Sequence, residues 1–296
     1  MRALSGIDET QARTCLDRKA FLFGHTLEAH PAMSLANLAE VIPALPANQV
    51  FHSNGRLQNG DDFDNAHNLH RPEESLAQAL EQLRTTDAYI MVRQPEVHAS
   101  FKPLYDALCA DVARMATAAG LPPVVDDAML YLFLASPGSV TPFHIDRYST
   151  CLMQVRGHKE VVVYPPWDPR VVADRDTEQF FARTGDRPPW RPEAEPLGER
   201  FAFSPGQALH IPFAAGHHVR NGDDDVSISV SIIFKTAESR RLMRALLFNQ
   251  RARRWLSRVG MEPRRVAMGA PGVATKAGLW NAARGIASVL GARGVA

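Results

Sequence analysis

Apolar and polar side chains alternate strictly along residues 226–232, with valine or isoleucine at every second position and serine between them. A period of two is typical of a β-strand with one packed face and one hydrophilic face, so we predict a strand over residues 226–234. The serines either line a pocket or face solvent, and the pattern leaves both open. Shorter apolar runs predict further strands at residues 129–134, 151–156, 161–164, 201–203, 208–212 and 217–220.

The first 127 residues mix helices with a few strands. We expect strands at residues 21–23 and 88–92 and helices near residues 75–83 and 101–119. The last of these stops at Gly120. It carries an apolar stripe that should cover the outside of a β-barrel, formed by Leu104, Leu108, Val112 and Met115.

A helix is predicted directly after the last strand, over residues 237–259. Its apolar residues recur at steps of 3, 4, 3 and 4, the seam spacing of paired helices, at Ala245, Phe248, Ala252, Trp255 and Val259. Packing within the chain and a homodimer seam both fit this stripe. Residues 260–272 read as a linker and residues 276–290 as a second amphipathic helix. We therefore divide the chain into a catalytic region, residues 1–236, and a basic C-terminal helical region, residues 237–296.

Residues 165–200 form a long insertion rich in proline, aspartate and arginine, with a short helix expected over residues 177–184. Such loops in compact domains are usually functional lids or disordered segments, so we predict an element that gates substrate access. The alternative is that its aromatic residues only anchor it to the barrel. These residues are Trp167, Phe180, Phe181 and Trp190.

Length and composition limit the class of protein. With 296 residues, 45% of them hydrophobic, the chain can bury a large core. There is no 18-residue apolar run and no signal-peptide pattern at the start, so we expect no membrane association. Three sparse cysteines without metal spacing, Cys15, Cys109 and Cys151, indicate a reducing compartment, and we expect a cytoplasmic protein.

The charge is unevenly distributed. Residues 237–296 hold 12 Lys and Arg against 2 Asp and Glu, a balance of +10, whereas residues 1–236 hold 21 against 30, a balance of −9. A basic region can attract nucleic acid or an acidic partner. We favour a solvated helical face, because aromatic residues are poorly interleaved and no nucleic-acid-binding motif is present.

The candidate chemistry centres on His144 and Asp146, which are separated by Ile145, and on His217, 71 residues beyond Asp146. Alternate residues of a strand point the same way, so His144 and Asp146 should reach one cavity, with His217 brought there by another strand. Two neutral imidazoles and one carboxylate form the three-point face used by non-haem Fe(II) oxygenases. The sequence therefore predicts an iron site.

Other histidines compete for this role. His158 opens a second triplet, with Lys159 and Glu160, but it follows Gly157 where one strand turns into the next, so we interpret it as a hairpin residue. His210 reads as an ordinary polar residue of a barrel strand, although a role facing substrate stays open.

The ordered motifs at residues 141–146, 154–159, 164–166, 206–212 and 217–219 resemble those of the cupin-type JmjC oxygenases, over about residues 128–236. The resemblance implies a mainly β fold with flanking helices, a double-stranded β-helix (cupin or jelly-roll) core, and a need for Fe(II), 2-oxoglutarate and O2. It favours His217 over His218 as the third ligand. A related asparaginyl hydroxylase dimerises through C-terminal helices, so a homodimer through residues 237–259 is an open expectation, although the resemblance itself does not extend to these residues.

The same resemblance assigns the cosubstrate contacts. Thr141 and Lys159 fall where the family binds the far carboxylate of 2-oxoglutarate. Thr150 and Ser231 stand where asparaginyl hydroxylases of the family have Asn, so these contacts are partly altered. Independently, a dicarboxylate requires a buried cation, and Lys159 is the only Lys or Arg of the predicted strands placed to serve. The alternative is a lysine in solvent, since Lys is rarely fully buried unless paired.

We therefore predict an Fe(II)- and 2-oxoglutarate-dependent hydroxylase that acts on a peptide, protein, amino-acid or other small-molecule substrate, with an Asp or Asn side chain as the first candidate. It would release succinate and CO2. Two alternatives remain: a non-catalytic cupin-like ligand sensor that contacts a partner through its basic region, and a different metal enzyme on the same barrel.

Overall fold

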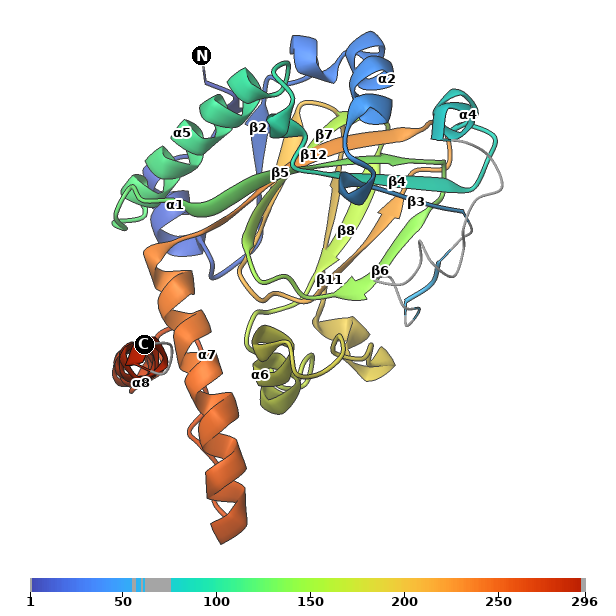
Figure 1. Ribbon diagram of the computed structural model, residues 1–296. Helices are drawn as coiled ribbons and strands as arrows, with labels where there is room; N and C mark the ends of the chain where they lie inside the picture. The colour runs from blue at the N-terminus through green and yellow to red at the C-terminus, as the bar shows by residue number, and fades with distance from the viewer. Residues whose placement is uncertain (1, 55–56, 60, 62–75, 294–296) are drawn as a thin grey trace.

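Two antiparallel β-sheets form a barrel at the centre of the structure, and helices lie on more than one side of it (Figure 1). The computed structural model describes residues 2–54, 57–59, 61 and 76–293. Within these residues the larger sheet has the order β1 (Leu4–Ser5), β2 (Phe21–His25), β10 (Gln207–Ile211), β7 (Ser149–Arg156), β12 (Ser227–Lys235), β5 (Asp126–Ala135), β4 (Ala88–Arg93) and β3 (Val50–Asn54). The smaller sheet has the order β6 (Val140–His144), β11 (His217–Asn221), β8 (Lys159–Val163) and β9 (Glu199–Phe203). The predicted jelly-roll core with flanking helices is confirmed.

Strand β12 shows how the alternating pattern builds the barrel wall. Its apolar residues, among them Val230 and Ile232, join the large outer core beneath α5 (Lys102–Ala118). Its three serines are at most 2% exposed and take the opposite, inward face. The serines therefore line the barrel interior, and the alternative of a solvent-exposed face is wrong.

Helix α5 covers the larger sheet as its apolar stripe predicted, since all four stripe residues are buried in the outer core. The other helices among the described residues of the N-terminal half are short. They are α1 (Glu9–Cys15), α2 (Leu35–Ala44), α4 (Leu76–Glu81) and the 3-10 turns Pro31–Met33, Ala47–Gln49 and Pro95–Val97. The residues just before α4, included in its predicted span, lie outside the described part of the chain.

The turn between β7 and β8 explains the second histidine triplet. Gly157 has φ +71°, and a Cβ atom there would collide with the carbonyl oxygen of Val226, so the position requires glycine. His158 follows in this turn with an exposed side chain, and its Nδ1 lies 3.1 Å from the hydroxyl of Ser204. His158 thus lies in the turn between two strands, as predicted, but β7 and β8 belong to different sheets, so the prediction of a hairpin is wrong.

The insertion packs on the outside of the smaller sheet through its aromatic residues. Its regular elements are α6 (Asp174–Ala182) and the 3-10 turn Pro192–Leu197. The Trp190 ring lies 5.0 Å from Phe143, and Phe181 lies 5.1 Å from Phe213, between ring centroids. The anchoring interpretation therefore holds, while the gating role stays a prediction.

Helix α7 (Ala237–Leu256) leaves the barrel, and α8 (Val273–Arg293) packs beside it (Figure 1). The 3-10 turn Ser257–Val259 extends α7. Of the predicted seam, Ala245 is buried against the barrel and α6, whereas Trp255 and Val259 are each 69% exposed. Packing within the chain thus explains only the first half of the stripe. The homodimer and the division at residue 236 stay predictions.

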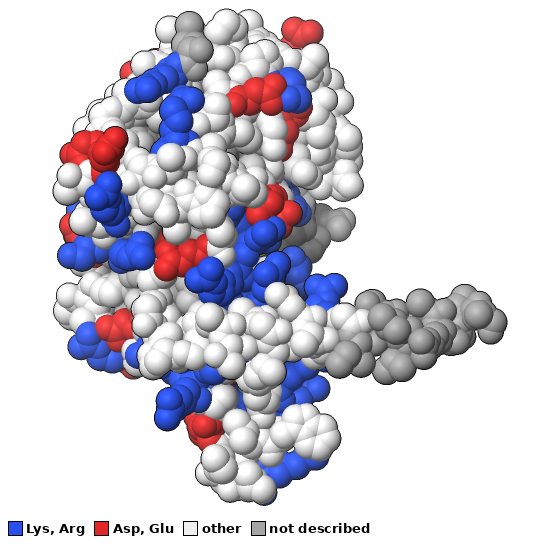
Figure 2. Space-filling view, turned by 90° about the vertical axis from the view of Figure 1, so that its left-hand side faces the viewer, with Lys and Arg blue, Asp and Glu red and all other residues white. Residues whose placement is uncertain are grey.

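The basic character predicted for the C-terminal helical region is visible on the surface of the structure. Lysine and arginine side chains gather around α7 and α8 on the face shown in Figure 2. Among the described helices, none is long and apolar enough to span a membrane.

Candidate metal centre

The structure brings His144, Asp146 and His217 together at one end of the barrel. His144 is the last residue of β6 and His217 the first residue of β11, and the two residues pair directly across the strands. Their ring centroids are 4.1 Å apart, and His217 Nε2 lies 3.7 Å from Asp146 Oδ2. One ligand atom from each residue lies within 4.8 Å of the others.

Asp146 corrects one detail of the prediction. We expected it to share a strand with His144, but β6 ends at His144, and Asp146 lies in the turn that leads to β7. Its side chain is 35% exposed, whereas that of His217 is 4% exposed. Strand pairing fixes the two histidines, while the carboxylate depends on the turn.

Hydrogen bonds set the tautomer of both rings. His144 Nδ1 lies 2.7 Å from the carbonyl oxygen of Pro142, and His217 Nδ1 lies 3.1 Å from that of Ala215. A carbonyl only accepts, so in each ring Nδ1 carries the proton and donates it. In the neutral ring Nε2 then carries the lone pair, which is the state that binds a metal.

Burial keeps these rings neutral. It lowers the pKa of His144 well below its usual value, and the repulsion that would arise if His217 were protonated as well acts in the same direction. It also lowers the pKa of His217, although the Asp146 carboxylate opposes this. Arg187, carried by the insertion, adds a positive charge that lowers both pKa values further. The insertion therefore acts electrostatically on the site, a connection the sequence did not indicate.

Lys159 lies inside the same barrel and is 6% exposed. Its Nζ donates a hydrogen bond to Ser229 Oγ at 2.8 Å, and burial lowers its pKa to about 7. Within the described chain, no carboxylate lies within the 4.0 Å ion-pair distance of this nitrogen. A buried amine without a carboxylate partner is costly to charge, so the site favours an anionic ligand.

The remaining predicted contacts also line the interior. Thr141 is buried and donates a hydrogen bond to the hydroxyl of Tyr89 at 3.4 Å. Thr150 is 5% exposed, and its hydroxyl finds no hydrogen-bond partner among the described residues, while Ser231 shares the inward face with Ser229. Sequence reasoning missed Tyr89. Burial raises the pKa of Tyr89 to about 12, so its hydroxyl stays protonated.

Two further histidines take structural positions. His218 points to the outside of the smaller sheet, where its ring lies 5.8 Å from Trp190 and its Nε2 3.9 Å from Glu195. His210 is fully buried, and its Nε2 accepts the backbone N–H of Asp17 while its Nδ1 donates to the carbonyl of Thr150. Both ring nitrogens of His210 are used, so the open role facing substrate is wrong.

A jelly-roll barrel with two neutral histidines and a carboxylate at one end defines a metal-binding cupin, and this donor set fits Fe(II). Residues 26–240 match the cupin-like domain family, and the chain belongs to that family. A relative with a Jumonji C domain supports the resemblance to the JmjC oxygenases. The Jumonji C domain-containing protein 5 of Drosophila melanogaster is 32% identical over 104 residues, which make up 33% of this chain and 26% of that protein.

One solved structure supports the fold. The structure of E. coli ycfD matches with a TM-score of 0.50 and 16% sequence identity, covering 92% of this chain and 64% of that chain. Another structure, described as YcfD, a ribosomal oxygenase from Escherichia coli, has a TM-score of 0.47 and 15% identity, covering 95% of this chain and 67% of that one. The chain spans about a quarter of the Drosophila protein and about two thirds of the bacterial one.

Proposed function

We propose that this protein is an Fe(II)- and 2-oxoglutarate-dependent hydroxylase that acts on a peptide, protein or amino-acid side chain. The observation that carries the proposal is the pairing of two features in one barrel. The His144, Asp146 and His217 cluster provides a metal face, and Lys159 provides a buried amine without a described carboxylate partner. A ligand that chelates a metal at one end and carries an anion at the other satisfies both.

Each residue has a distinct task in this proposal. His144, Asp146 and His217 hold Fe(II), while Lys159 and Thr141 hold the distal carboxylate of 2-oxoglutarate. Iron and 2-oxoglutarate together supply the activation of O2, which yields succinate, CO2 and an oxidised substrate.

The pocket around that carboxylate is completed by neutral polar groups. Tyr89, in contact with Thr141, adds a protonated hydroxyl to this end of the pocket. Thr150 and Ser231 line the pocket where related enzymes use amides, and both are short hydroxyl side chains. The barrel wall excludes water from the groups that hold the cosubstrate.

The insertion fits a gating role in this proposal. It carries Arg187, whose charge acts on both histidines, and it covers the outside of the smaller sheet next to the metal centre. A segment that is anchored on one side and reaches the site on the other is placed to control substrate entry.

The ligand-sensor alternative uses the same barrel without turnover. It requires a bound anion but neither O2 consumption nor metal-dependent succinate release. The neutral tautomers of both histidines favour the enzyme, because a sensor of a small anion has no need for two imidazoles prepared as metal ligands.

Succinate formation tests the proposal. The protein is loaded anaerobically with Fe(II) and 2-oxoglutarate, O2 is added, and succinate is measured by mass spectrometry with and without peptides that contain Asp or Asn. Asp146→Ala should abolish succinate formation and most Fe(II) affinity. Asp106→Ala is the matched control, since that carboxylate is 56% exposed on α5 and should leave turnover unchanged. Normal 2-oxoglutarate consumption by Asp146→Ala would refute the assigned site.

A further inference from the structure

The residue directly after Asp146 is tied to the insertion. Arg147 Nε donates a hydrogen bond to the carbonyl oxygen of Phe180 at 3.1 Å, and its Nη2 donates to the same oxygen. The guanidinium carbon also lies 3.7 Å from the centroid of the Phe180 ring. Arg147 thus contacts Phe180 of α6 in two ways. Its guanidinium N–H groups bond the carbonyl oxygen, and the guanidinium plane lies over the aromatic ring.

This contact matters because of where Asp146 lies. The two histidines are held by strand pairing, and each ring is also held by a hydrogen bond to the carbonyl two residues before it. Asp146 lies past the end of β6, between the buried Ile145 and Arg147. The carboxylate is therefore held from one side by core packing and from the other side by the Arg147 contact.

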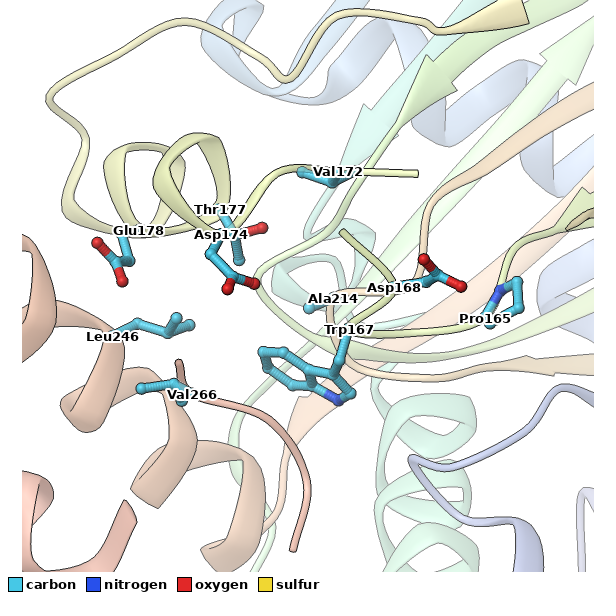
Figure 3. Close-up of a pocket in the computed structure, with 10 residues that line it drawn as sticks. All are labelled: Pro165, Trp167, Asp168, Val172, Asp174, Thr177, Glu178, Ala214, Leu246 and Val266. Atoms are coloured by element: carbon cyan, nitrogen blue, oxygen red, sulfur yellow. The ribbon is translucent and has the colours of Figure 1, made fainter. Parts of the chain in front are cut away.

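Helix α6 is fixed in turn by α7. Glu178, two residues before Phe180, has a side chain that is 1% exposed and accepts hydrogen bonds from Arg253 at 2.7 and 3.0 Å and from Asn249 at 2.9 Å. Figure 3 shows Glu178 on α6 facing α7, across from Leu246. The cavity drawn there measures about 10 Å³, enough for one water and too small for a substrate. A continuous set of contacts thus runs from α7 through α6 to the Asp146 turn.

We propose that Arg147 is a positioning residue, which holds the Asp146 carboxylate against the two histidines by clamping the turn to Phe180. The inference rests on the proposed function, since it concerns the metal that this function requires. It makes metal affinity depend on how the insertion is seated, because the clamp exists only while α6 lies against the turn.

Metal binding in the absence of turnover tests the clamp. The dissociation constant of Mn(II) is measured by calorimetry, and the Mn(II) resonance spectrum is recorded, for wild type, Arg147→Ala and Arg147→Lys. Substitutions behind a metal ligand typically cost 10- to 100-fold in affinity. We expect about tenfold weaker binding for Arg147→Ala, and a smaller loss for Arg147→Lys, which keeps the charge but not the fork. Arg175→Ala is the matched control, since Arg175 is an exposed arginine on α6, the helix that Arg147 contacts.

A second variant tests the path through α6. Glu178→Gln loosens α6 from α7 and should weaken Mn(II) binding in the same direction. If the two substitutions act through one set of contacts, the Mn(II) affinity of the double variant Arg147→Ala with Glu178→Gln falls by clearly less than the product of the two single-variant factors. Independent, multiplicative losses would overturn the path through α6.

The outcomes separate the clamp from the proposed function. Wild-type protein that binds no divalent metal refutes the proposed function and this inference with it. Wild-type binding with an unchanged dissociation constant in Arg147→Ala refutes the clamp alone, even if the variant unfolds at a lower temperature, because that result would mean a purely structural contact. If Arg147→Ala does not fold, Arg147→Lys decides by the same comparison.

Discussion

The buried Lys159 predicts that binding of 2-oxoglutarate takes up a proton. Burial lowers the pKa of this amine to about 7, so it is mostly neutral at pH 8 when no anion is bound. A carboxylate placed beside it favours the charged form and raises its pKa. Binding therefore pulls a proton from solvent, and the apparent affinity falls as the pH rises above 7.

The magnitude follows from that pKa. When the pKa of the empty site is 7 and that of the occupied site is well above 9, the apparent dissociation constant scales with one plus ten to the power of pH minus 7. Between pH 7 and pH 9 the affinity should fall roughly 50-fold, or about 2.3 kcal/mol. At pH 8, about 0.9 proton should be taken up for each 2-oxoglutarate bound. Tyr89, with a pKa of about 12, does not titrate in this range.

Calorimetry of Mn(II)-loaded protein without O2, in buffers of different ionisation enthalpy, measures both quantities. Two controls isolate the lysine. 2-Oxobutyrate chelates the metal but lacks the distal carboxylate, and Lys159→Met lacks the amine, so neither should show the extra proton. An affinity for 2-oxoglutarate that stays constant from pH 7 to pH 9, with no proton uptake, would mean that Lys159 is not the carboxylate anchor.

Three further predictions concern other parts of the chain. His217→Ala should abolish the weak visible absorption band that 2-oxoglutarate gives with Fe(II) under anaerobic conditions. His218→Ala should keep this band, since His218 faces the outside of the barrel. The reverse result would mean that the inward and outward faces of β11 are exchanged. Glu178→Gln should lower the free energy of unfolding by about 3 kcal/mol in urea titrations, because it leaves Arg253 without a buried charge partner, and an unchanged midpoint would contradict this. If α7 forms a homodimer, Trp255→Ser should convert it to a monomer in light scattering, and a wild-type chain that is already monomeric would exclude the dimer.

The barrel and its polar interior could be predicted because their signals are local. In β12 the serine positions follow from a period of two, and the structure places all of them inward. The choice between His217 and His218 has the same origin, because neighbouring residues of a strand face opposite sides. The predicted strands and long helices agree with the structure to within a few residues at their ends.

Asp146 shows where local signals stop. The rule that alternate residues point the same way holds only inside a strand, and nothing in residues 140–148 indicates that pairing ends at His144. Strand pairing depends on which partner lies alongside, here β11, more than 70 residues later in the sequence. The sequence therefore identified the three residues of the cluster, but not the element that carries the carboxylate.

Tyr89 and Arg147 were missed because each acquires its role from a distant contact. The Tyr89 hydroxyl meets Thr141, 52 residues away, and Arg147 meets Phe180, 33 residues away. Neither residue belongs to a motif, and neither contact has a periodicity that a sequence could show. Two of the three cluster residues are thus fixed by the barrel itself, whereas the third is held through an insertion and a C-terminal helix. It follows that substitutions far from the barrel, in α6 or α7, should act on metal binding through Asp146 and leave the two histidines in place.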